Sequence, residues 1–241
     1  MLIFIQEVIL ISLFLNIHVF SLDLNKSLIA YWSFDDSTAK DFSGNDYHGM
    51  LMNNPTPNIG VNGIGTCFHF QGSPKYSVLP NIPTGQYIKI PMLPLQNYTS
   101  FTISLWVKED KMENKAGNGY IFFGMHSGRW CGIMNHDQNL NGDLFTTYAV
   151  GGLIAGENIS IPFNYNLRNS WIFYSMTYDN GAIRGYINGS LVGTISQKVA
   201  IDGNYAGIAT HYWNTAGEDR ECTFFTGSID EVMIFNTSLS S

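Results

Sequence analysis

The chain has few charged residues, and basic residues are the scarcest. Of its 241 residues, 12 are Lys or Arg and 19 are Asp or Glu, which gives a formal net charge of −7 and a charged fraction of 13%. Proteins that bind nucleic acids usually carry a basic patch, and the sequence contains no cluster of Lys and Arg. We therefore expect no nucleic-acid partner.

Cysteine is also rare. The chain contains Cys67, Cys131 and Cys222, an odd number for an exported protein. The three residues allow one disulfide with a free thiol, or no disulfide at all, and their spacing does not choose between these states.

The sequence lacks any helix-length segment with a helical hydrophobic period. Short β-rich runs instead recur at even spacing, with turn residues such as Asn188-Gly189 between them. This rhythm predicts an all-β fold, a two-sheet antiparallel β-sandwich. No linker or repeat interrupts it, so we expect one domain over residues 22–241. The predicted strands are 28–34, 49–52, 67–71, 86–90, 101–108, 120–125, 131–135, 144–150, 171–178, 182–187, 191–196, 206–211 and 223–235.

The first 21 residues form an apolar stretch that ends in Val19-Phe20-Ser21. This pattern predicts a signal peptide over residues 1–21, cleaved before Leu22. The alternative is an uncleaved membrane anchor, but four polar residues within the stretch make a poor span. We expect a secreted protein with no stable membrane span after cleavage. Five acceptor triplets for N-glycosylation, beginning at Asn25, Asn97, Asn158, Asn188 and Asn236, agree with export as a glycoprotein.

Two segments near the ends of the chain combine a β-rich apolar run with adjacent carboxylates. They are Leu28–Asp36, which ends in Asp35-Asp36, and Phe225–Phe235, which contains Asp230-Glu231. Paired carboxylates are costly to bury unless a cation or hydrogen bonds satisfy them. We therefore expect the two strands to lie together and to share one acidic site.

Several blocks resemble the laminin G-like jelly-roll domains of the concanavalin A-like lectin/glucanase superfamily. They follow one another in the family's order from Leu28 to the C-terminus, and together they imply a jelly roll that serves as a binding module. The blocks are Ala30–Asp35 with Asp41–Asn45 and His48-Gly49, Phe68–Gly72, Phe101–Val107, Trp171–Tyr178 with Gly185–Gly189, and Gly227–Val232 with Ile234–Asn236.

The resemblance implies a structural calcium ion that ties the first strand to the last. Asp230 would supply the carboxylate, and Asp35 (or the carbonyls of its neighbours) and the carbonyl of Gly72 would complete the site. Calcium accepts six to eight oxygen ligands in irregular geometry, which suits such a set. The alternative is that Asp230 accepts hydrogen bonds from local backbone amides or faces water, while Asp35 only begins a turn.

The segment His211–Arg220 is expected to be a polar loop that displays aromatic rings. Tyr212 and Trp213 lie in it beside Asp219. Sugar rings pack their apolar face on aromatic side chains and bond their hydroxyls to planar polar groups. Arg129 and Trp130 could extend the same surface. These five residues are the predicted ligand-binding site.

The alternative for Trp213 and Trp130 is that both fold back over the edge of the sandwich as part of the core. Trp32, Trp106 and Trp171 lie in predicted strands and are expected in the core.

No catalytic residue is predicted. Glucanases of the superfamily carry three alternate carboxylates on one strand, E-x-D-x-E, and the sequence has no such triplet. Asp230 and Glu231 are adjacent and would point to opposite faces. We therefore expect a lectin-type module that binds carbohydrate or a glycosylated partner and is not an enzyme. The alternative is a protein–protein adhesion or structural domain without affinity for sugars.

Overall fold

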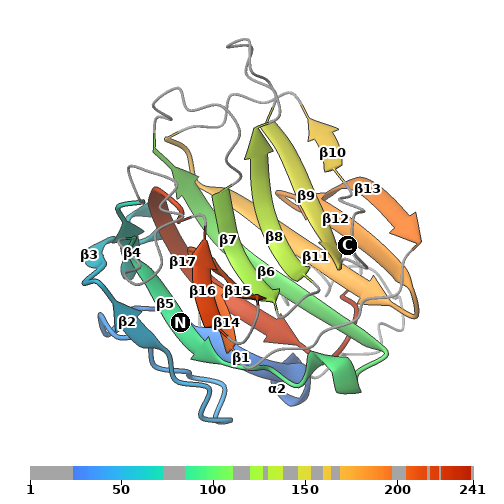
Figure 1. The fold of residues 1–241 in the computed structure, drawn as a ribbon, viewed down its shortest axis with the longest axis horizontal. Helices are drawn as coiled ribbons and strands as arrows, with labels where there is room; N and C mark the ends of the chain where they lie inside the picture. Colours follow the sequence, from blue (N-terminus) through green and yellow to red (C-terminus); the bar gives the residue numbers. More distant parts are fainter. Residues whose placement is uncertain are drawn as a thin grey trace, which may run out of the picture.

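Two antiparallel sheets pack face to face in the computed structural model of the chain (Figure 1). The structure describes residues 24–72, 85–110, 120–126, 130–137, 146–152, 160–163, 169–196, 205–215, 218–222 and 224–239. The predicted signal peptide, residues 1–21, lies outside the described residues.

The first sheet, here called sheet A, contains the first and last strands of the chain. Its order is β13 (Ser190–Ser196), β12 (Ala182–Ile187), β11 (Ile172–Asp179), β6 (Ser100–Glu109), β17 (Gly227–Phe235), β4 (Thr66–Phe70) and β3 (Thr56–Ile59). The strand β1 (Leu28–Trp32) follows the short helix α2 (Leu24–Ser27) and pairs with β17.

The second sheet, sheet B, lies in front of sheet A in Figure 1. Its order is β10 (Ser160–Phe163), β9 (Thr146–Gly152), β8 (Trp130–Asp137), β7 (Tyr120–His126), β14 (Tyr205–Ile208), β5 (Tyr87–Pro91) and β2 (Met50–Met52). Two short 3₁₀ turns, η2 (Val61–Gly63) and η3 (Leu95–Asn97), interrupt the connections. The predicted antiparallel sandwich is confirmed.

The core forms between the sheets because the strands alternate. In β6, Phe101, Ile103, Leu105 and Val107 are at most 1% exposed and belong to the main hydrophobic cluster, which both sheets build. A strand places successive side chains on opposite faces, so the even-numbered residues of β6 lie on the outer face of sheet A.

The strands from the two ends of the chain are neighbours, as predicted. Ala30 lies opposite Ile234 and Trp32 opposite Val232. The first half of β17 instead pairs with β4, where Gly227 lies opposite Phe70. The change of partner coincides with a β-bulge at Glu231, whose φ of 49° is left-handed. The bulge thus lets the first half of β17 pair with β4 and the second half pair with β1.

Three predictions about local structure were wrong. Residues 211–220, expected as a loop, form a β-hairpin of β15 (His211–Thr215) and β16 (Glu218–Cys222). The strands β3 and β10 were not predicted, because neither carries a long alternating apolar run. Trp106 and Trp171 are only half-buried, whereas Trp32 is fully buried as expected.

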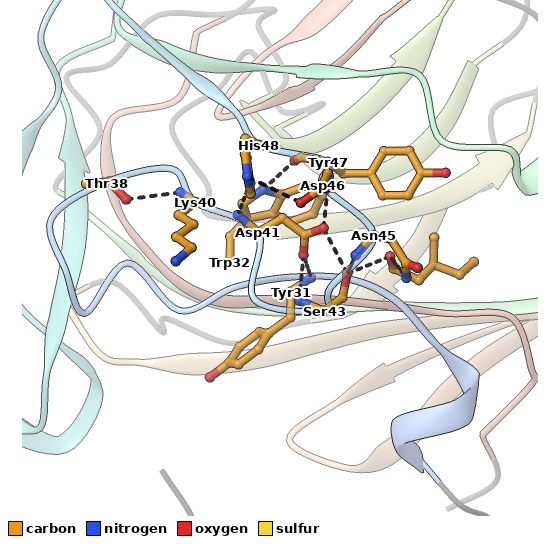
Figure 2. A network of polar contacts seen from close by, with 11 residues as sticks. Tyr31, Trp32, Thr38, Lys40, Asp41, Ser43, Asn45, Asp46, Tyr47 and His48 are labelled. Carbon is orange, nitrogen blue, oxygen red and sulfur yellow. Dashed lines mark hydrogen bonds and ion pairs between the residues drawn. The ribbon is translucent and has the colours of Figure 1, made fainter.

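The segment between β1 and β2 is held in place by the buried carboxylate of Asp41 (Figure 2). Its Oδ1 accepts the backbone N–H groups of Tyr31 and Ser43 at 2.9 Å, and its Oδ2 accepts the N–H of Tyr47 at 2.9 Å and the hydroxyl of Ser43 at 2.8 Å. The Asp41 N–H itself donates to His48 Nδ1 at 3.0 Å. These bonds hold the connection between β1 and β2, which includes Asp35, in one conformation.

We predict that Asp41→Ala lowers the free energy of unfolding by more than about 2 kcal/mol, because buried N–H donors lose a charged acceptor. Asp36→Ala is a matched control: Asp36 is exposed and bonds to Thr38 beside it, so its loss should cost less than about 1 kcal/mol. Urea unfolding measures both values. Equal costs would show that the Asp41 network does not stabilise the fold.

Candidate functional site

The acidic residue pair of β17 lies where the strand bulges. Asp230 is 2% exposed, although it faces outward from sheet A. The connection between β3 and β4 covers it, and the N–H of Val61 donates to Asp230 Oδ2 at 2.9 Å. The N–H of Glu231 donates to Asp230 Oδ1, also at 2.9 Å. Asp230 therefore accepts one local backbone amide, that of Glu231, as the alternative expectation had it, and one distant amide, that of Val61.

The neighbouring carboxylate, Glu231, contacts the first strand. The Tyr31 hydroxyl of β1 donates to Glu231 Oε2 at 2.5 Å. Burial and this bond raise the pKa of Tyr31 well above its usual range. Burial also raises the pKa of Glu231, and the nearby charge of Asp35 adds to the rise, while the Tyr31 bond opposes it.

The third carboxylate, Asp35, reaches the same place from the end of β1. It is exposed, and its Oδ1 accepts the N–H of Thr66 at 3.1 Å. Burial raises the pKa of Asp230 to about 7, partly opposed by the bond from Val61, and the charges of Glu231 and Asp35 contribute to the rise. The structure therefore brings three carboxylates from the two ends of the chain into one electrostatic cluster.

Two glycines let the β3–β4 connection approach these carboxylates. A Cβ added at Gly65, whose φ is 65°, would lie 1.9 Å from Asp35 Oδ1. A Cβ added at Gly60 would lie 2.2 Å from the Ile64 carbonyl oxygen and 2.9 Å from Asp230 Oδ2. Carboxylate and carbonyl oxygens thus converge on this connection. A side chain at Gly60 would meet the Ile64 backbone, and one at Gly65 would have to displace the Asp35 carboxylate.

Gly72, the third predicted ligand, lies apart from the other two. Its N–H donates to Thr226 Oγ1 at 3.1 Å, near the beginning of β17. Since Gly227 lies opposite Phe70, Gly72 and Asp230 are about five strand positions apart, roughly 16 Å at about 3.3 Å per residue. The structure brings together Asp35 and Asp230 but not Gly72.

The cluster offers oxygen donors, the type that calcium prefers over softer metals. Within the described ranges, no group of three or more His, Cys, Asp or Glu side chains has the arrangement of a metal site. Any ion at Asp230 would therefore need backbone carbonyls, such as that of Ile64, beside the carboxylates. Such a mixed set fits calcium, which often takes carbonyl ligands.

Cys67 lies near Asp230 on the outer face of sheet A and is a free, fully buried thiol. Burial raises its pKa to about 11, and the charge of Asp230 adds to the rise. A thiol of this kind is neutral and unreactive at neutral pH. We therefore assign Cys67 to packing.

The predicted sugar-binding residues lie on the side of sheet B. Tyr212 and Trp213 are consecutive in β15, and Asp219 lies in β16 opposite Asn214. The strand β15 lies beside β7 and β14. Arg129 lies outside the described residues.

The strand register separates Trp130 from the hairpin along β7. Trp130 lies opposite His126, at the end of β7. In β14, Ala206 lies opposite Met125 and Ile208 opposite Phe123, so the chain moves away from the His126 end as it approaches β15. Tyr212, Trp213 and Asp219 belong to one hairpin, in which Tyr212 and Trp213 occupy alternate strand positions, and Trp130 lies opposite His126 at the end of β7.

Sequence reasoning missed a second aromatic position, on the outer face of sheet A. Trp106 of β6 lies opposite Phe173 of β11, with ring centroids 5.3 Å apart and ring planes inclined by 46°. The signal was present in the alternation of 101–107, which places Trp106 opposite in face to Phe101 and Ile103.

A family model for the concanavalin A-like lectin/glucanases superfamily matches residues 83–241, about two thirds of the chain. The chain belongs to the concanavalin A-like lectin/glucanase superfamily. No curated protein sequence matches it closely enough to count as a relative.

Solved structures with the same fold include domain 4 of AbnA, an extracellular arabinanase from Geobacillus stearothermophilus, in complex with arabinotriose. It is 20% identical, with a TM-score of 0.58, and the match covers 89% of this chain and 94% of that domain. This superfamily member thus has the size and fold of a separate domain that is seen with a sugar.

The binding domain of botulinum neurotoxin DC also has this fold, in complex with SialylT (19% identity, TM-score 0.61) and with rat synaptotagmin II (19% identity, TM-score 0.60). Each match covers 90% of this chain, and 49% and 50% of the respective neurotoxin chain. The chain therefore spans about half the length of these binding domains, and at this identity the likeness shows the fold alone.

We predict that, in the presence of a chelator, the free energy of unfolding falls as pH rises from about 4 to about 7. Folding raises the pKa of Asp230 from 3.8 to about 7, so the folded state binds a proton more tightly than the unfolded chain throughout this window. The stabilisation is complete below pH 3.8 and is lost as Asp230 ionises.

Urea unfolding of the wild type and of Asp230→Asn across this pH range tests the prediction. The variant cannot ionise at this position, so its slope should be smaller by up to about 1.4 kcal/mol per pH unit. Parallel curves for the two proteins would refute the assignment of the slope to Asp230.

Proposed function

We propose that this superfamily member is a carbohydrate-binding module, secreted or displayed outside the cell, that recognises a sugar or a glycosylated partner. The observation that carries the proposal is the fold, shared over 89% of the chain with an arabinanase domain in complex with arabinotriose. The candidate ligand-binding residues are Tyr212 and Trp213 of β15 and Asp219 of β16, because aromatic rings and carboxylates are the groups that saccharide binding needs.

Export is a part of the proposal that rests on the sequence. Residues 1–21 would act as a cleaved signal peptide, and Asn97, which is exposed in η3, is one acceptor for N-glycosylation. Among the helices described, none combines the length and the apolar character of a membrane span.

Catalysis has no part in the proposed function. The adjacent carboxylates of β17 already have structural partners: Asp230 accepts two backbone N–H groups, and Glu231 accepts the Tyr31 hydroxyl. Retaining glycosidases instead aim two carboxylates, about 5–5.5 Å apart, at one sugar bond.

A structural calcium ion is the second part of the proposal. Asp230 and Asp35, with backbone carbonyls of the β3–β4 connection, would hold the ion. Its charge would offset the mutual repulsion of Asp230, Glu231 and Asp35, which contributes to the raised pKa of Asp230. The ion would act on stability, by joining the end of β1 to β17, and not on chemistry.

A protein–protein adhesion domain is the alternative function. The structure of the neurotoxin binding domain with synaptotagmin II is the observation that favours it, since the same fold is there seen with a protein. Such a domain would bind its partner with equal affinity before and after enzymatic removal of glycans from that partner.

We predict that a glycan array detects saccharide binding by the wild-type protein and that Trp213→Ala abolishes or strongly reduces it. Removing an aromatic ring from a sugar site removes the packing surface and costs more than about 1 kcal/mol. Circular dichroism should show an intact fold. Tyr98→Ala is an aromatic control, because Tyr98 is half-buried at the end of η3 and packs against the main hydrophobic cluster rather than lying in the hairpin. Absence of binding by the wild type to every saccharide would refute the carbohydrate proposal.

We also predict that calcium raises the melting temperature relative to chelator, and that Asp230→Asn removes this difference. Binding to the folded state adds about 2.7 kcal/mol at a free calcium concentration 100 times the dissociation constant. Asp36→Asn, which changes an exposed carboxylate next to Asp35, should keep the full calcium effect. Equal melting temperatures of the wild type with calcium and with chelator would exclude the ion.

A further inference from the structure

Among the described residues, two segments of the chain cover parts of the outer face of sheet A. At one, the carbonyl of Thr237 accepts the Thr102 hydroxyl at 2.7 Å, and the N–H of Leu239 donates to the same hydroxyl at 2.9 Å, so the C-terminal segment crosses β6 there. At the other, the connection at Val61 covers Asp230.

Between these covered places lies the aromatic pair Trp106 and Phe173. Both residues are half-buried, in contrast to the fully buried Trp32 of the core. Trp171, which directly precedes β11, is half-buried too. Each of these three aromatic residues therefore keeps part of its surface accessible to solvent.

Polar groups surround the pair on neighbouring positions of the sheet. Lys108 follows Trp106 by two residues on the same face, roughly 6.6 Å along β6 at about 3.3 Å per residue. Asn188 borders Phe173 on the other side: its Oδ1 accepts the Phe173 N–H at 2.9 Å and its own N–H donates to the Phe173 carbonyl at 2.8 Å. Four residues on neighbouring strands therefore lie side by side across sheet A, in the order Asp230, Trp106, Phe173 and Asn188.

This arrangement matches the chemistry of a saccharide. A sugar ring has an apolar face that packs on one or two aromatic rings and a rim of hydroxyls that bond to ammonium and amide groups. A stable protein interface needs about 1,200–2,000 Å² of buried surface, whereas a sugar ring needs only an aromatic face and a few polar partners.

We propose that the outer face of sheet A holds a second saccharide-binding site, centred on Trp106 and Phe173 with Lys108 and Asn188 at its rim. It takes one or two rings of a neutral sugar. The site lies on the opposite side of the sandwich from the β15–β16 hairpin, which adjoins sheet B, so one chain holds two sugars that face away from each other. This inference rests on the proposed carbohydrate-binding function and assigns a second binding site to it.

The test is a glycan array of defined neutral oligosaccharides, including arabinotriose, probed with the full chain and with single variants. Trp106→Ala and Phe173→Ala should each weaken binding to a subset of the saccharides by about tenfold or more. Lys108→Gln keeps the aromatic packing and should weaken the same subset. Phe42→Ala is the matched control, because Phe42 is an exposed aromatic residue beneath Lys40 on the segment between β1 and β2, and it should bind as the wild type does.

The outcomes separate the two proposals. Loss in the Trp106, Phe173 and Lys108 variants, with thermal melts that show folded protein, supports the second site. Unchanged binding by the Phe173 and Lys108 variants, while the wild type binds sugars, overturns the second site and leaves the carbohydrate function in place. A wild type that binds no saccharide on the array overturns the carbohydrate function, and the second site falls with it.

Discussion

The pairing of the first strand with the last is the constraint on which the rest of the structure depends. β17 runs through the middle of sheet A, beside β6 along its length, and it changes partner from β4 to β1 at the bulge. The bulge places Asp230 against the β3–β4 connection and Glu231 against Tyr31, so that two carboxylates lie in a mostly apolar setting. Their raised pKa values measure the energetic cost of that position. A divalent cation or protonation would reduce this cost, which makes the bulge the point where solution conditions act on the stability of the sandwich.

The same strand geometry determines which surfaces are open for ligands. The inward residues of β6 fill the core, and its outward residues form a strip that other segments cover only in part. On the other side of the sandwich, the β15–β16 hairpin stands beside β7 and β14.

Much of the fold could be predicted because its strands are regular. Phe101–Val107 alternates strictly, and the Asn188-Gly189 turn has the positive φ values that a tight hairpin needs. The hairpin 211–222 could not be predicted, since its strands are short and polar and carry no alternating apolar pattern. Of the candidate site, Asp35 and Asp230 could be placed together, because both follow from the pairing of the terminal strands. Gly72 could not be placed, since its distance from Asp230 depends on the register of β4 against β17.

The amino-acid sequence by itself determined the all-β class, the superfamily and the neighbouring positions of the two terminal strands. The all-β class follows from local periods and the superfamily from short motifs, while the pairing of the terminal strands follows from the paired carboxylates at the two ends of the chain. The tertiary structure alone decided that Trp106 faces outward beside Phe173, that the β3–β4 connection covers Asp230, and that Trp130 stands away from the hairpin. These outcomes depend on strand register and on which segment crosses which face. A shift of one residue in β6 would turn Trp106 to the core side of sheet A.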